Sequence, residues 1–97
     1  MLETFTCATF APLVSETFRL DAGGELVDLA LVEAGELPEA APHGERMPFS
    51  LVFVGPAGVV YPQRSYPVEH PVLGSFHLFI VPIAADADGV RYQAIFS

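Results

Sequence analysis

The sequence contains no lysine, and its only strong cations are four arginines set against twelve acidic residues, which gives a formal net charge of −8. Nucleic acids and anionic lipids bind proteins through Lys and Arg, and the affinity grows with the number of phosphate charges neutralised. The shortage of cations therefore argues against a nucleic-acid partner and against docking on a membrane. The arginines are scattered along the chain, at Arg19, Arg46, Arg64 and Arg91.

Cysteine and long apolar runs are scarce as well. Cys7 is alone, so it can form neither an intramolecular disulfide nor a zinc site, and we interpret it as a small apolar residue in a short helix. The N-terminus lacks the basic and apolar regions of a signal peptide. The longest apolar stretches, 51–61 and 78–85, contain Gly or Pro and are shorter than the roughly 20 residues that span a membrane. We therefore expect a cytoplasmic protein.

The motifs of common active sites are missing too. No serine lies in a Gly-x-Ser-x-Gly sequence, and a chain without lysine has no Lys-containing phosphate loop. Asp86 and Asp88-Gly89 resemble the start of a calcium loop, but Val90 and Arg91 follow where further oxygen ligands are needed. We therefore predict no enzyme activity, no catalytic residue and no cofactor.

What the chain does contain is apolar residues in short segments. With 97 residues, 52% of them hydrophobic and 16% charged, it is suited to one domain spanning residues 1–97 rather than to a disordered chain. Folding a chain of this size buries about 64% of its surface, which is enough for one modest core.

Period-2 alternation of β-branched and aromatic residues predicts strands, and Gly and Pro divide the chain between them. We expect a mainly β protein, a small and strongly bent antiparallel sheet or barrel of five to six strands. Sequential hairpins would arrange the strands as a meander, after one short helix within 6–15. The expected strands cover 16–21, 25–33, 49–54, 64–70, 75–83 and 90–96.

Residues 34–48 carry no periodic signal. Three prolines, two glycines and three acidic residues predict a long, exposed and mobile acidic loop in this range.

Two of the expected strands, 49–54 and 75–83, are apolar on both faces. Such strands do not fit a single open sheet with one wet face, so either the sheet closes into a barrel or the second face meets another chain. For the second case the interface candidates are Val52, Val54, Phe79 and Val81. The partner would be a second copy, in a homo-oligomer, or another protein.

Two histidines are candidates for a metal site. If Leu73-Gly74 is a two-residue turn, His70 lies directly opposite His77 on the paired strand, with Cβ atoms about 5 Å apart. Glu69 then points to the other face, and a metal site needs at least one more donor. The alternative is a polar pair at a hairpin end, and we expect no bound metal.

Several segments together resemble a family of bacterial domains of unknown function with about this length, which implies no activity. They are Thr6–Val14, Thr17-Phe18, Leu29–Ala34, Pro48–Pro56, Glu69–Gly74, Phe79–Ile83 and Asp88–Phe96.

The element order also resembles, more loosely, the Sm-like barrel, which has a short helix followed by five bent antiparallel strands. Leu13–Leu20 occupies the position between helix and first strand. The Asp-x-x-x-Asn and Arg-Gly elements of that family have no counterpart here.

The sequence thus leaves three functional hypotheses. The first is a non-enzymatic structural or protein-interaction module that self-associates. The second is an RNA-binding Sm-like protein, which the charge opposes. The third is a small-ligand or metal-binding barrel built around His70, His77 and Tyr66.

Overall fold

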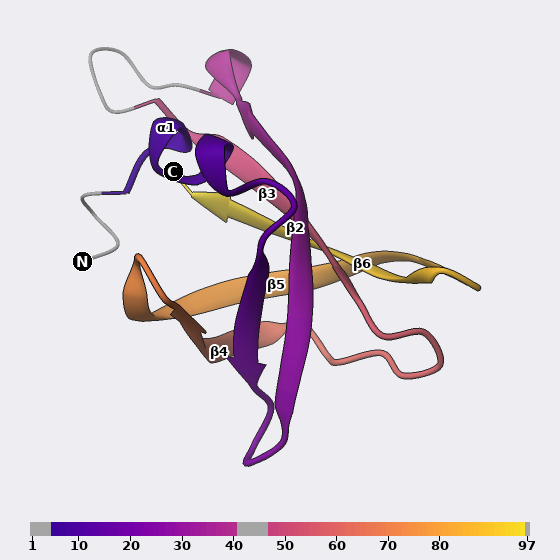
Figure 1. Cartoon of the computed structure of the whole chain (residues 1–97). Helices are drawn as coiled ribbons and strands as arrows, with labels where there is room; N and C mark the ends of the chain where they lie inside the picture. Colours follow the sequence, from indigo (N-terminus) through magenta and orange to yellow (C-terminus); the bar gives the residue numbers. More distant parts are fainter. Residues whose placement is uncertain (1–4, 41–46, 97) are drawn as a thin grey trace.

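The alternating segments pair into a closed antiparallel barrel of six strands in the order β1-β2-β3-β6-β5-β4 (Figure 1). The computed structural model describes residues 5–40 and 47–96. The predicted fold class, a small antiparallel barrel after a short helix, is confirmed. In chain order the elements are α1 (Cys7–Phe10), the 3₁₀ turn η2 (Ala11–Leu13), β1 (Thr17–Asp21), β2 (Leu26–Glu36), the 3₁₀ turn η3 (Pro38–Ala40), β3 (Phe49–Gly55), β4 (Arg64–His70), β5 (Gly74–Asp86) and β6 (Gly89–Phe96).

Alternation along each strand fills the barrel interior. Buried and exposed residues alternate along β1 and β4, because successive side chains of a strand point to opposite faces. The inward side chains form one core of aromatic and branched residues. Its largest fully buried members are Tyr66, Tyr92, Phe10, Phe18, Phe49, Phe53, Leu20, Leu29, Leu31, Leu51, Leu78 and Ile80.

The predicted meander is wrong in one connection. β3 pairs with β6 instead of β4, while β4 pairs with β5 and closes the barrel against β1. The reason lies in residues 56–63, which cross from β3 to β4 instead of making a tight hairpin. The Tyr61 N–H donates to the Tyr92 hydroxyl at 3.0 Å, and the Tyr66 hydroxyl donates to the Pro62 carbonyl at 2.6 Å. Tyr92 and Tyr66 thus hold the crossing segment in place.

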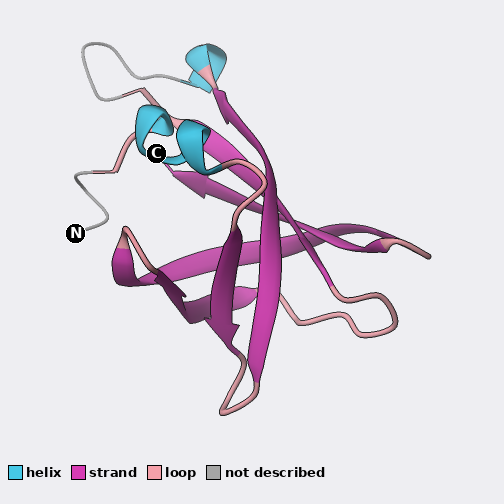
Figure 2. Cartoon of the chain, in the orientation of Figure 1, coloured by secondary structure: helices cyan, strands magenta, loops and turns pink. Residues whose placement is uncertain are grey.

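One end of the barrel is covered by the helical turns (Figure 2). The buried ring of Phe10 in α1 lies 5.9 Å from Phe49 and 5.6 Å from Phe96, measured between ring centroids. The Thr6 backbone N–H donates to Thr9 Oγ1 at 3.0 Å and helps to begin the helix. None of the helices described has the length and apolar character needed to cross a membrane.

The loop expected over 34–48 begins later than predicted. β2 continues to Glu36, and its last residues pair with β3, with Ala34 opposite Leu51 and Glu36 opposite Phe49. The Leu37 N–H then donates to the Pro48 carbonyl at 2.8 Å, which closes the segment at its base. Backbone pairing with β3 therefore outweighs the poor strand propensity of Gly35. Residues 41–46 of the expected loop lie outside the described residues.

Candidate functional site

The outer surface of β3, β6 and β5 carries a group of apolar side chains, with the polar residues Gln93 and Arg91 on the middle strand β6. Gln93 of β6 pairs with Val52 of β3 on one side and with Val81 of β5 on the other. Two positions along the strand, Arg91 pairs with Val54 in the same way. The interface candidates on β3 and β5 thus lie on one face, separated by a single strand.

We call this surface the apolar face. It consists of the outward side chains Val52, Val54, Phe79, Val81, Ile83 and Ile95.

Exposure is uneven across the apolar face. Ile95, Phe79 and Ile83 are 58%, 52% and 49% exposed, whereas Val52 is only 8% exposed. Val52 is covered because its register partners Glu33 and Gln93 flank it on β2 and β6. The predicted interface residues therefore differ in accessibility. The Val52 side chain is covered by its neighbours within the barrel, whereas Phe79 offers a large side chain that a partner could contact.

Two residues of the apolar face, Ile83 and Ile95, were not among the interface candidates predicted from the sequence. Ile95 shares one face of β6 with Arg91 and Gln93, so the period-2 pattern contained the signal that it points outward. Ile83 has the same parity as Phe79 and Val81, so the same pattern also indicated that it points outward, and the shift in pairing between Pro82 and Ala84 changes the alternation only beyond it. Such a bulge adds a residue and inverts the alternation beyond it.

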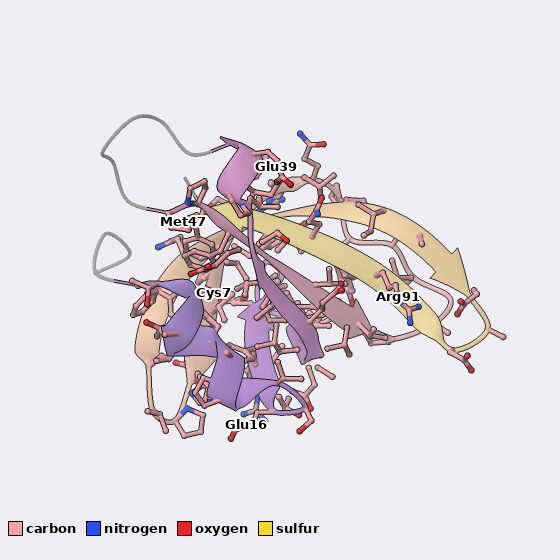
Figure 3. The ribbon with its side chains drawn as sticks, turned by 90° about the horizontal axis from the view of Figure 1, so that it is seen from above. Cys7, Glu16, Glu39, Met47 and Arg91 are labelled. Carbon is pink, nitrogen blue, oxygen red and sulfur yellow. The ribbon has the colours of Figure 1, made fainter. Side chains whose placement is uncertain are left out.

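Few charges interrupt the apolar face. Arg91 lies on β6 toward the β5–β6 turn (Figure 3), and its Nη1 is 3.8 Å from Asp86 Oδ2. Glu33 is exposed on β2, opposite Val52.

The predicted pairing of His70 with His77 is wrong. His70 is opposite Gly74 and His77 is opposite Pro67, because the chain turns over the three residues 71–73 instead of at Leu73-Gly74. His70 therefore points into the barrel and His77 points to solvent. Among the described residues, no three His, Cys, Asp or Glu side chains gather where they could hold a metal ion.

Both ring nitrogens of His70 are engaged by protein groups. Nδ1 accepts the backbone N–H groups of Val72 at 3.0 Å and Leu73 at 3.3 Å. Nε2 lies 2.7 Å from Glu16 Oε1, and the ring stacks on Phe18 with centroids 4.5 Å apart. Because Nδ1 accepts two donors it carries no proton, so Nε2 holds the ring proton and donates it to the carboxylate. His70 in this arrangement ties the β4–β5 turn to the start of β1.

An open hollow of about 450 Å³ lies beside this histidine on the β1–β4 seam, lined by Thr17, Arg19, Glu69, His70, Pro71, Gly74 and Ser75. The third sequence hypothesis needed His70, His77 and Tyr66 in one site. The structure separates them, since His77 is exposed while the Tyr66 hydroxyl is used by Pro62.

Among the described residues no side chain forms a hydrogen bond with the Cys7 thiol that could activate it. Burial, and secondly the negative charge of Glu36, raise the pKa of its thiol, which keeps the thiol protonated. Its position on α1, packed against the core, agrees with its interpretation as a small apolar residue (Figure 3).

Comparison with known proteins identifies a family for the chain but no individual relative. No curated protein and no solved structure matches the chain, so the resemblance to Sm-like barrels has no support from relatives. The barrel also has six strands, whereas the Sm-like fold has five. A family model matches residues 5–96, nearly the whole chain. The chain belongs to the family described as Domain of unknown function (DUF6916).

Proposed function

We propose that this protein is a non-enzymatic interaction domain that associates with a second copy of itself through the apolar face. The observation that carries the proposal is the position of Phe79, Ile83 and Ile95, each about half exposed, on two adjacent strands. Single exposed hydrophobic residues are ordinary on a protein surface, whereas a contiguous group on neighbouring strands is typical of an interaction site.

The barrel itself cannot bury these side chains. Its interior is already filled by the inward residues of the same strands, such as Tyr92 of β6 and Ile80 of β5, which are fully buried. Removing the apolar face from water would contribute about 25 cal/mol for each Å² buried. A stable dimer needs roughly 800 Å² of contact from each partner, so residues around the face, such as Val32 on β2, would contribute as well.

Sedimentation equilibrium or light scattering tests the proposal. We expect the wild-type protein to show twice the chain mass of 10.4 kDa at micromolar concentration. Phe79→Glu places a charge in the contact and should weaken the dimer by about 100-fold, which corresponds to some 3 kcal/mol. The matched control is Val72→Glu, because Val72 is also exposed but lies in the β4–β5 turn, outside the apolar face.

Circular dichroism and the thermal midpoint should show that both variants keep the fold. A wild-type protein that stays monomeric up to millimolar concentration contradicts the proposal. So does an equal loss of association in Phe79→Glu and Val72→Glu.

A further inference from the structure

The apolar face is bordered by one carboxylate and one guanidinium, placed on opposite sides of β3. Glu33 on β2 is opposite Val52, and Arg91 on β6 is opposite Val54. Strands lie about 4.8 Å apart and alternate residues about 6.7 Å apart, so the two backbone positions are separated by roughly 12 Å. Long side chains can bridge such positions between two molecules that meet across this face.

A twofold axis makes this arrangement complementary to itself. If the axis lies in the plane of the contact, crosses β3 between Val52 and Val54 and runs perpendicular to the line from Glu33 to Arg91, it carries Glu33 of one copy to the position facing the partner's Arg91. The same axis passes between Phe79 and Ile95, which lie two residues beyond the paired Val81 and Gln93. The exposed apolar side chains of one copy would therefore face those of the other, as an isologous interface requires.

Charge explains why the occupant is a second copy. The chain carries a net charge of −8, so two copies that meet through most surfaces would bring carboxylates together. At the apolar face, by contrast, Arg91 offers a positive charge to the Glu33 carboxylate of another copy, although Asp86 lies beside it. The guanidinium of Arg91 is about half exposed and has only a 3.8 Å contact with Asp86, which leaves donors for a second carboxylate. A basic partner protein would be attracted to the acidic surfaces instead.

We infer that two copies pack their apolar faces about a twofold axis that crosses β3 between Val52 and Val54, with each Glu33 facing the partner's Arg91. This inference rests on the proposed self-association and adds its geometry.

Charge reversal tests the arrangement. Each of Glu33→Arg and Arg91→Glu puts like charges at both facing positions and should weaken the dimer by about tenfold or more. The double variant restores opposite charges and should return to within about threefold of the wild type. An equimolar mixture of the two single variants should also form a mixed dimer more tightly than either variant pairs with itself. Sedimentation velocity with one fluorescently labelled variant measures all of these associations.

Two control variants repeat these charge changes away from the apolar face. Glu69→Arg alters an exposed carboxylate on β4, and Arg64→Glu alters an exposed cation on the same strand. An equimolar mixture of these two control variants should not form a mixed dimer more tightly than either variant pairs with itself.

The outcomes separate this inference from the proposed function. Rescue in the double variant and in the mixture supports the twofold arrangement. If Phe79→Glu disrupts the dimer while the charge variants do not, or are not rescued by combination, self-association stands and this geometry is overturned. If Phe79→Glu has no effect on association, both the proposed function and the geometry are overturned.

Discussion

At the scale of single residues, His70 is a polar side chain that is buried in the barrel. A buried polar group lowers stability unless its hydrogen bonds are made. His70 makes three, to Val72, Leu73 and Glu16, and also stacks on Phe18. The histidine therefore acts as a structural link between the β4–β5 turn and the segment that leads into β1.

Replacing His70 tests this structural role. His70→Ala removes a stacked ring and leaves two backbone N–H groups without their acceptor, which should lower the free energy of unfolding by about 2–4 kcal/mol. The control is His77→Ala on the partner strand, where the side chain is exposed and the expected change is within about 0.5 kcal/mol. Urea unfolding followed by circular dichroism measures both. Equal effects of the two substitutions would show that the hydrogen bonds of His70 contribute little.

Tyr66 gives a prediction at alkaline pH. Its hydroxyl is buried, and burial raises its pKa above the ordinary value of 10.0, with Arg64 opposing the shift and Tyr92 adding to it. Near pH 10 the unfolded chain loses this proton while the folded chain keeps it. The stabilisation is thus complete below about pH 10 and is lost as the pH rises further.

Thermal unfolding between pH 9 and pH 11 measures this loss. The melting temperature of the wild type should fall more steeply than that of Tyr66→Phe, which has no proton to lose at this position. Some loss should remain in the variant, because the pKa of Tyr61 is also raised, by burial first and then by the Glu25 carboxylate. Parallel pH profiles for the two proteins would contradict the burial of the Tyr66 hydroxyl.

At the scale of elements, local patterns were sufficient for the β1–β2 hairpin, for the bounds of β4 and for the position of the β5–β6 turn. The β1–β2 hairpin follows from alternation and from Gly23-Gly24, two glycines that both have positive φ. The bounds of β4 follow from alternation alone. The sequence Asp86-Ala87-Asp88-Gly89 is typical of a hairpin turn, and the structure places Ala87 and Asp88 between the paired Asp86 and Gly89. The structure adds that a Cβ at Gly89 would lie 2.5 Å from the carbonyl oxygen of Gly55, so this turn also needs glycine for close packing.

Features set by contacts between distant segments were not predictable. The pairing of β3 with β6 depends on the anchoring of residues 56–63 by Tyr66 and Tyr92, and no local signal encodes that anchoring. The His70–His77 prediction failed because a turn of three residues, in place of two, shifts the register and sends the two rings to opposite faces. The outward positions of the apolar face were indicated by alternation on β3, β5 and β6, but the bulge between Pro82 and Ala84, which reverses the alternation beyond Ile83, depends on the pairing with β6.

At the scale of the whole molecule, the His70–Glu16 pair and the apolar face lie on different surfaces of the barrel. The His70–Glu16 pair sits near the end of η2, whereas Arg91 lies on β6 beside the apolar face (Figure 3). Substitutions at one part should therefore leave the other unchanged, since effects at distant sites add independently. This separation lets stability and association be measured by different variants of one protein.

Charge distribution over the whole molecule argues against an RNA partner. The three described arginines lie on three strands, each beside its own neighbour. Arg19 Nε is 3.4 Å from Asp28 Oδ1, Arg64 lies over the Tyr66 ring with Cζ 4.9 Å from the centroid, and Arg91 is near Asp86. No stripe of cations forms among the residues described, and a net charge of −8 repels a polyanion over a Debye length of about 8 Å at physiological salt.

We therefore expect no binding of labelled oligo-U or oligo-A RNA below about 100 µM at physiological salt, which is weaker than ordinary non-specific binding. Fluorescence anisotropy measures it, with Arg64→Ala and Arg91→Ala as the variants. A dimer formed through the apolar face would engage Arg91 further and leave still fewer cations free, so RNA should not bind better at protein concentrations where the dimer forms. Saturable micromolar binding that either variant weakens would contradict this expectation. It would favour the RNA-binding hypothesis over the interaction domain proposed above.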